Sequence, residues 1–86
     1  MKYGIFSVRD AKAEAFGQPF FAQQRGLAVR SFSDECERSD SGLNKHPEDY
    51  ALFHIGEYDD LSGLVTPLAQ PVQIALALDY VKLLTA

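Results

Sequence analysis

The chain has 86 residues, 47% of them hydrophobic, and its 12 acidic residues outnumber its 8 lysines and arginines, which gives a formal net charge of −4 at pH 7. A chain of this length forms one small domain with a single core and little surplus stability, so we expect residues 1–86 to be one domain that associates as a homodimer. The lone cysteine, Cys36, excludes an intrachain disulfide, a cysteine-based zinc site and a redox pair.

The first predicted element is a strand over residues 2–9, in which both alternating sets of side chains are mostly apolar. This pattern is typical of a strand that is covered on both faces. Residues 10–17 carry charged side chains and alanines, which indicates a connection. Residues 19–22 are predicted to form a short edge strand that pairs with the first, with Pro19 as its first residue because proline cannot donate to a ladder.

A helix is predicted over residues 24–38, because Ala28, Phe32 and Cys36 recur at steps of four and form one apolar stripe. The cysteine on this stripe is most simply a small core residue. Residues 39–45 contain serine, aspartate, glycine and asparagine, which end helices and form turns.

The clearest strand spans residues 50–55, before Gly56 and Glu57; its residues alternate and are rich in aromatic and branched side chains. Residues 59–63 have the composition of a turn, and residues 64–66 resemble a short partner strand closed by Pro67. This spacing predicts a β-hairpin.

Residues 71–84 fit two structures. Their apolar residues alternate between positions 72 and 80, as in a strand, yet Ile74, Leu78 and Val81 also trace a helical face. The alanine and leucine content and the length favour a helix, with Pro71 in its first turn. The order of elements, β-β-α-β-β-α, predicts an α+β fold with a small antiparallel sheet and one or two helices.

Positive charge is concentrated at the start of the chain. In residues 1–30 five cations face two acids, a charge of +3, whereas in residues 31–86 three cations face ten acids, a charge of −7. Cations interleaved with aromatic rings suit a flexible polyanion with exposed bases, so nucleic acid is a candidate partner. The predicted DNA-contacting residues are five cations and two adjacent rings: Lys2, Arg9, Lys12, Phe20, Phe21, Arg25 and Arg30.

Each of these residues also has a purely structural interpretation. The cations are equally well explained as solvated surface charges, with Arg30 paired to Asp34 four residues on. Phe20 and Phe21 are neighbours in a strand, so their rings should point to opposite faces, and both would more commonly fill a core or a dimer interface. Stacking of a base requires that at least one of the rings is exposed.

Catalysis and metal binding are not expected. The two histidines, His46 and His54, lie eight residues apart without the spacing of a metal site, and there is no glycine-rich phosphate loop or nucleophile motif. The acids nearby are read as turn residues, and these are Glu48, Asp49, Asp59 and Asp60. We therefore predict that the protein is not an enzyme and uses no metal and no cofactor.

The start of the chain lacks the features of a secretory signal, and its longest apolar stretch, residues 74–78, is far shorter than a membrane span. We therefore expect a soluble protein that stays in the cytoplasm and does not contact a membrane.

Four sequence strings carry a resemblance to a known family. Residues 2–10 read K-Y-x-I-F-x-V-R-D, residues 19–22 read P-F-F-A, residues 28–35 read A-V-R-S-F-S-D-E, and residues 46–56 read H-P-E-D-Y-A-L-F-H-I-G. Over about residues 1–66 the chain resembles the small nonstructural protein of gokushovirus-type microviruses, which are single-stranded DNA phages with minimal genomes. The resemblance implies a DNA-binding protein of genome replication or packaging in the host cell cytoplasm, and it implies no particular contact residues.

Two functional hypotheses follow. The first is a phage nonstructural protein that binds single-stranded DNA without sequence specificity through the basic, aromatic segment. The second is a protein-interaction factor that engages a viral or host replication protein, or a capsid precursor, through an acidic or apolar surface, because acidic surfaces repel phosphate and attract basic partners.

Overall fold

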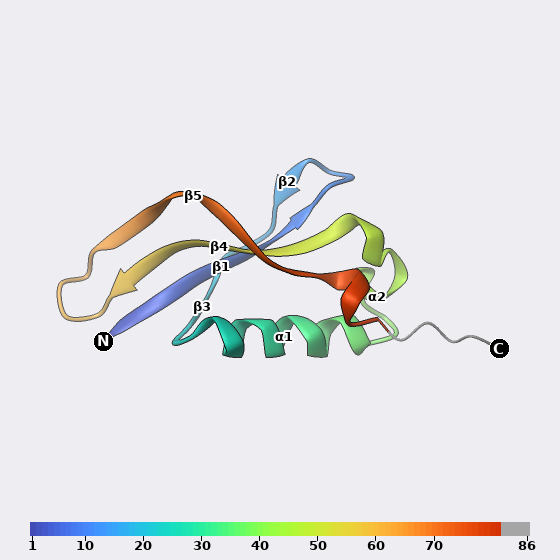
Figure 1. Ribbon diagram of the computed structural model, residues 1–86, viewed down its shortest axis with the longest axis horizontal. Helices are drawn as coiled ribbons and strands as arrows, with labels where there is room; N and C mark the ends of the chain where they lie inside the picture. The colour runs from blue at the N-terminus through green and yellow to red at the C-terminus, as the bar shows by residue number, and fades with distance from the viewer. Residues whose placement is uncertain (82–86) are drawn as a thin grey trace.

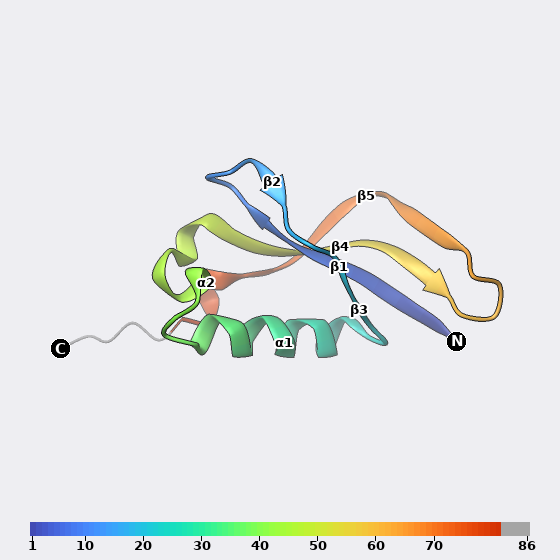
Figure 2. The ribbon, with the colours of Figure 1, turned by 180° about the vertical axis from the view of Figure 1, so that it is seen from behind.

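The computed structural model describes residues 1–81 and contains one twisted antiparallel sheet with a helix along one side (Figures 1 and 2). The strand order is β2-β1-β4-β5, and β3 pairs with β1 on the side away from β4. The strands are β1 (Lys2–Asp10), β2 (Ala15–Phe16), β3 (Phe20–Ala22), β4 (Tyr50–Asp59) and β5 (Val65–Leu76). The α+β class with a small antiparallel sheet is therefore confirmed.

The helices lie between β3 and β4 and after β5. Helix α1 covers Arg25–Glu37, which confirms the helix predicted over residues 24–38. It is followed by the short α2 (Gly42–Lys45), whose first turn is capped where the N–H of Leu43 bonds Ser41 Oγ at 3.2 Å, and by the 3₁₀ turn η1 (Pro47–Asp49). A second 3₁₀ turn, η2 (Ala77–Asp79), follows β5. None of the helices within residues 1–81 is long and apolar enough to cross a membrane.

The core lies between the sheet and α1. The predicted stripe of Ala28, Phe32 and Cys36 is buried against Phe6 of β1 and Leu52 of β4. These two strand residues lie on the same face because Phe6 pairs opposite His54, two positions from Leu52. We call the face of the sheet that carries Phe6 and Leu52 the α1 face. The apolar stripe predicted from the sequence is the side of α1 that packs against it.

No helix or strand of residues 1–81 covers the other face of β1, so the prediction that both faces are covered holds only at the centre of the strand. Figures 1 and 2 show α1 along one side of the sheet while the β1–β2 hairpin extends away on the opposite side. Ile5 and Ser7 point to this second face and are nevertheless buried. Their burial comes from neighbouring side chains and from the segment after β2, where Ser7 Oγ donates to the Gly17 carbonyl at 2.8 Å.

The helix predicted from Pro71 onward is also wrong for the described residues, because residues 65–76 form β5 and, up to residue 81, only the 3₁₀ turn η2 follows. The outer edge of β4 offers a ladder to this segment, and Leu52 pairs with Ala75 while Phe53 pairs with Gln73. Pairing with β4 satisfies backbone N–H and C=O groups of residues 65–76, so this segment forms a strand and not a helix. The end of the predicted helix, residues 82–84, lies outside the described residues.

Pro67 was expected to close the second strand of the hairpin, but β5 continues past it. Gly56 pairs with Pro67 and His54 pairs with Val72, so residues 68–71 bulge away from the ladder opposite Ile55. Prolines are tolerated in edge strands and at bulges, where their missing N–H is not needed. An edge strand of this kind can therefore contain the two prolines.

Residues 10–17, predicted as a connection, contain a tight hairpin. The carboxylate of Asp10 accepts the backbone N–H groups of Lys12 at 2.9 Å and Ala13 at 3.3 Å, which closes a turn. Glu14 has φ 57°, a left-handed conformation, and the chain then returns as β2 beside the end of β1. Strand β2 has only two residues, too few for an alternating pattern in the sequence. It forms because the turn brings these residues beside the end of β1.

Position 4 of β1 requires glycine because the Phe6 ring leaves no room for a side chain there. This gives a first prediction. A Cβ at this position would lie 2.6 Å from Cε2 and Cζ of the buried Phe6 ring and 3.3 Å from His54 Nε2. We expect Gly4→Ala to lower the free energy of unfolding by about 1–3 kcal/mol, measured by urea denaturation. In α1, Gly26→Ala meets no atom within 4 Å and should instead raise stability by roughly 0.5–1 kcal/mol. Equal stability of both variants would contradict this packing.

A second prediction concerns the thiol of Cys36. Burial, reinforced by the charges of Glu35 and Glu37, raises its pKa from 9.0 to about 11. In the native protein at pH 8 the thiol should therefore not react with a reagent that labels exposed cysteines, and it should react once urea unfolds the chain. Because the raised pKa stabilises the protonated folded form, stability should decrease as pH rises from 9.0 toward about 11. Rapid labelling of the native protein would contradict this prediction.

Candidate nucleic-acid interface

Aromatic side chains gather on the face of the sheet that α1 leaves uncovered. Cross-strand partners in a sheet point to the same face. Every second residue of β1, from Tyr3 to Arg9, points away from the α1 face. The partners of these residues in the neighbouring strands point the same way. The pairs are Tyr3 with Tyr58, Ile5 with Phe21, Ser7 with Phe53 and Arg9 with Phe16. We call this surface the open face, defined by Tyr3, Arg9, Phe16, Phe21, Phe53 and Tyr58.

The rings of the open face form two contacting groups. At one end Phe16 and Phe53 meet edge to face, with centroids 5.3 Å apart and planes at 78°. At the other end Phe21 meets Tyr58 at 5.7 Å and 74°, and Tyr58 lies 6.4 Å from Tyr3. Edge-to-face contacts leave ring faces free, and Phe16 and Phe21 are 43% and 55% exposed. Both groups can therefore present a flat apolar surface to a planar ligand.

Arg9 supplies the positive charge of the open face. Its guanidinium carbon lies 6.0 Å from the centroid of the Phe16 ring. Within residues 1–81 the ion pairs join Met1 with Asp60 and Arg38 with Glu35 and Asp40, so Arg9 forms none. Its donors thus remain available for an anion, and a guanidinium beside a ring suits a phosphate next to a stacked base.

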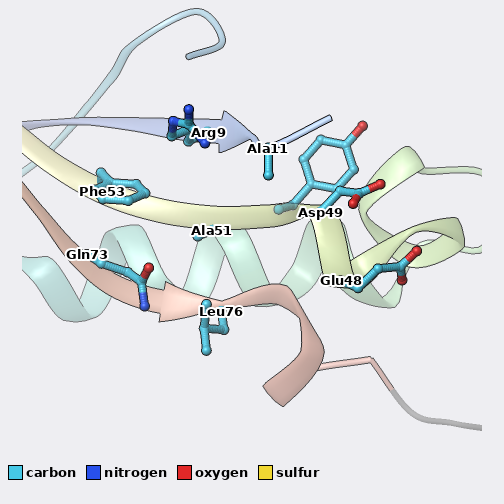
Figure 3. Close-up of a pocket in the computed structure, with 9 residues that line it drawn as sticks. Arg9, Ala11, Glu48, Asp49, Ala51, Phe53, Gln73 and Leu76 are labelled. Carbon is cyan, nitrogen blue, oxygen red and sulfur yellow. The ribbon is translucent and has the colours of Figure 1, made fainter. Parts of the chain in front are cut away.

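Two hollows lie on the open face, one at each end. The first, of about 210 Å³, is lined by Arg9, Phe53 and Gln73 among others, with Glu48 and Asp49 at its rim (Figure 3). The second, of about 450 Å³, is lined by three rings and one carboxylate: Tyr3, Phe21, Tyr58 and Asp60. The open face is thus hollowed where its rings and its single cation lie.

A β-bulge brings Phe53 and Tyr58 to the same face. Simple alternation would place them on opposite faces, because they are five positions apart. Ile5 pairs with Gly56 and Phe6 pairs with His54, so one extra residue of β4 shifts the register. The prediction from the sequence missed both rings and Phe16. The only sequence signal was Gly56, which fits a bulge but does not identify one.

Two of the seven residues predicted to contact DNA lie on the open face, Arg9 and Phe21. As predicted, Phe20 and Phe21 point to opposite faces, and Phe20 packs toward the core, 5.9 Å from the Phe6 ring. Lys12 lies in the β1–β2 turn, at the end of the sheet beside Glu48. The rings are therefore separated by the sheet, and the hollow that Lys12 lines contains none of the residues that define the open face.

The remaining predicted cations lie elsewhere. Lys2 alternates with Tyr3 and pairs opposite Asp59, on the α1 face of the sheet. Arg25 and Arg30 belong to α1, where Arg25 Nε donates to His54 Nδ1 at 3.0 Å. No ion pair between Arg30 and Asp34 is formed in the described part of the chain. The structure does not gather the five cations on one surface.

The acids of the β4–β5 turn have the structural role expected for them. The N–H of Leu61 donates to Asp59 Oδ1 at 2.9 Å, and this bond, with the nearby charge of Lys2, lowers the pKa of Asp59. Among residues 1–81 no three histidine, cysteine, aspartate or glutamate side chains are placed to hold a metal ion.

Comparison with known proteins gives one match. A family model described as Phage ORF5 protein matches residues 3–80. This range contains α1 and every residue of the open face. No curated protein and no solved structure matches the chain.

Proposed function

The chain belongs to the phage ORF5 protein family, and from this premise we propose that it is a nonstructural microvirus protein that binds single-stranded DNA without sequence specificity. Its stage of action would be replication or packaging of the viral genome in the host cell cytoplasm. The observation that carries the proposal is the open face, where exposed rings flank an arginine that has no carboxylate partner in residues 1–81.

The rings are arranged along the direction of the strands. Successive open-face positions of β1 are two residues apart, which is a repeat of roughly 7 Å. An aromatic ring lies at or next to each of these positions: Tyr3 itself, Phe21 next to Ile5, Phe53 next to Ser7 and Phe16 next to Arg9. An extended DNA strand could therefore stack successive bases on several of these rings. Stacking on aromatic rings tolerates any base, because every base has a π-face. It also requires unpaired bases, which favours single-stranded over double-stranded DNA.

Phosphates would be held by Arg9 of the open face and by Lys12 of the β1–β2 turn. Two cations per subunit give modest affinity, and a homodimer would raise it by presenting two open faces to one strand. The acidic remainder of the chain would limit non-specific adhesion. Dimerisation is checked by sedimentation equilibrium.

A third prediction tests this use of charge. If Arg9 and Lys12 each neutralise one phosphate, the logarithm of the binding constant should decrease with the logarithm of salt concentration with a slope of about −1.4 per subunit. Fluorescence anisotropy with a labelled thymine oligonucleotide between about 50 and 200 mM salt measures this slope.

The matched variants are Arg9→Gln and Arg30→Gln, which remove the same charge from the open face and from α1. Arg9→Gln should make the slope less steep by about 0.7 and weaken binding, whereas Arg30→Gln should leave the slope unchanged. Equal effects of the two variants would mean that the open face does not hold the DNA.

The alternative function, a protein-interaction factor, is favoured by one observation. The β4–β5 hairpin carries exposed apolar side chains at its tip, and Leu61 is 89% exposed, Leu64 66% and Val65 62%. Such a tip suits a viral or host protein partner rather than a polyanion. Failure to bind any oligonucleotide at about 50 mM salt, where phosphate contacts are strongest, would favour this function over DNA binding.

A further inference from the structure

The hollow at the Tyr3 end of the open face combines rings with a carboxylate. Its lining consists of Tyr3, Phe21, Tyr58 and Asp60. Asp60 directly follows β4, and its backbone N–H donates to the Met1 carbonyl at 3.2 Å, which fixes its position beside the rings. Asp60 Oδ1 lies 2.6 Å from the α-amino nitrogen of Met1, and in the described residues Oδ2 accepts no hydrogen bond. A free acceptor therefore borders an aromatic pocket.

A carboxylate in this position is unexpected on a surface that only grips phosphate, because it repels phosphate and carbonyl oxygens alike. A carboxylate only accepts hydrogen bonds. Oδ1 already accepts from the Met1 α-amino group, but each oxygen has two lone pairs, so the carboxylate can still receive two parallel N–H groups. In single-stranded DNA such donors are found on the Watson–Crick edges of the bases, which are unpaired. The carboxylate is thus suited to the edge of a base whose face is stacked on a ring.

The four bases differ in what their edges offer to a carboxylate. Guanine presents two adjacent donors, N1–H and the 2-amino group, whereas cytosine and adenine present one amino group each. Thymine presents a single N3–H between two carbonyl oxygens, which a carboxylate repels. We infer that this hollow is a base pocket that prefers guanine over thymine, an inference that rests on the proposed DNA-binding function.

The arrangement of the rings supports one base in the pocket. Phe21 meets Tyr58 edge to face at 74°, and its ring is 55% exposed, so it is the ring with the most accessible face. A base stacked on Phe21 would have Tyr3 and Tyr58 beside it and its edge toward Asp60, because all four residues border the same hollow. Binding elsewhere on the open face would stay independent of base identity.

The test uses three labelled oligonucleotides that differ at one central position: all thymine, one guanine, and one hypoxanthine, which keeps N1–H and lacks the 2-amino group. We expect the guanine oligonucleotide to bind the wild-type protein roughly tenfold more tightly than the thymine one. The hypoxanthine oligonucleotide should bind with intermediate affinity. Binding of the all-thymine oligonucleotide tests the proposed function separately.

Asp60→Asn should abolish the guanine preference and leave affinity for all-thymine DNA equal or higher. Asp60→Glu, which retains the carboxylate, should keep part of the preference, and Glu57→Gln is the control that removes a charge from the α1 face. Thermal unfolding confirms that each variant is folded. A preference that survives in Asp60→Asn, or equal binding of all three oligonucleotides by the wild type, would overturn the base pocket. Absence of binding to every oligonucleotide would overturn the proposed function itself.

Discussion

Replacing Phe16 and Phe21 together by alanine is expected to weaken binding of single-stranded DNA roughly thirtyfold while the chain stays folded. A base stacked on an aromatic side chain contributes about 1–3 kcal/mol, so loss of two stacks at the low end of this range corresponds to a factor of about 30. The two rings belong to different groups of the open face and are each about half exposed. Fluorescence anisotropy at constant salt measures the change.

Two controls distinguish loss of stacking from loss of apolar surface. Leu27→Ala removes a side chain that is 43% exposed on α1, as Phe16 is on the open face, and should leave affinity unchanged. Phe21→Tyr keeps the ring and should bind nearly as the wild type does. If the double variant binds as tightly as the wild type, the rings are not the DNA contact.

Replacing Phe6 by alanine is expected to have the largest effect on stability, a loss of about 3–5 kcal/mol. Phe6 is 1% exposed, its ring stacks on His54 at 4.7 Å, and it packs in the cluster that joins β1 to α1. Domains of this size are stable by only about 5–10 kcal/mol, so the variant should be partly unfolded at 37 °C. Urea denaturation followed by circular dichroism measures the loss.

Phe21→Ala is the matched control for this experiment, because Phe21 lies in the adjacent strand and is about half exposed. It should lose less than about 1 kcal/mol, as is usual for substitutions outside the core. Together the two variants should separate the faces of the sheet: one loses stability and the other loses DNA affinity. A small loss of stability in Phe6→Ala would contradict the assignment of the core.

Local patterns were sufficient where a single face decides the structure. The helix was predicted because Ala28, Phe32 and Cys36 repeat at the helical period, and one buried stripe is enough to define α1. The first strand was predicted from the apolar side chains on both of its faces, and the β4–β5 hairpin from alternation and turn residues, although β5 continues past Pro67. The tail was predicted wrongly because both periods fit residues 71–81 and only the vacant edge of β4 selects the strand.

The candidate site was only partly predictable. The sequence indicated that Phe20 and Phe21 diverge and that Arg9 could contact DNA, but it grouped them with Lys2, Arg25 and Arg30, which the structure places elsewhere. Phe53 and Tyr58 were missed because their shared face depends on a bulge that exists only when β1 and β4 are paired.

The sequence by itself determined that β1 and β4 are strands and α1 is a helix, the stripe that α1 buries and the concentration of positive charge near the start of the chain, because these depend on the spacing of neighbouring residues. Tertiary structure alone decided which rings share the open face, that β5 is a strand, and that the cations are dispersed. These features depend on register and on pairing between segments that are distant in sequence, and a shift of one residue moves every following side chain to the other face.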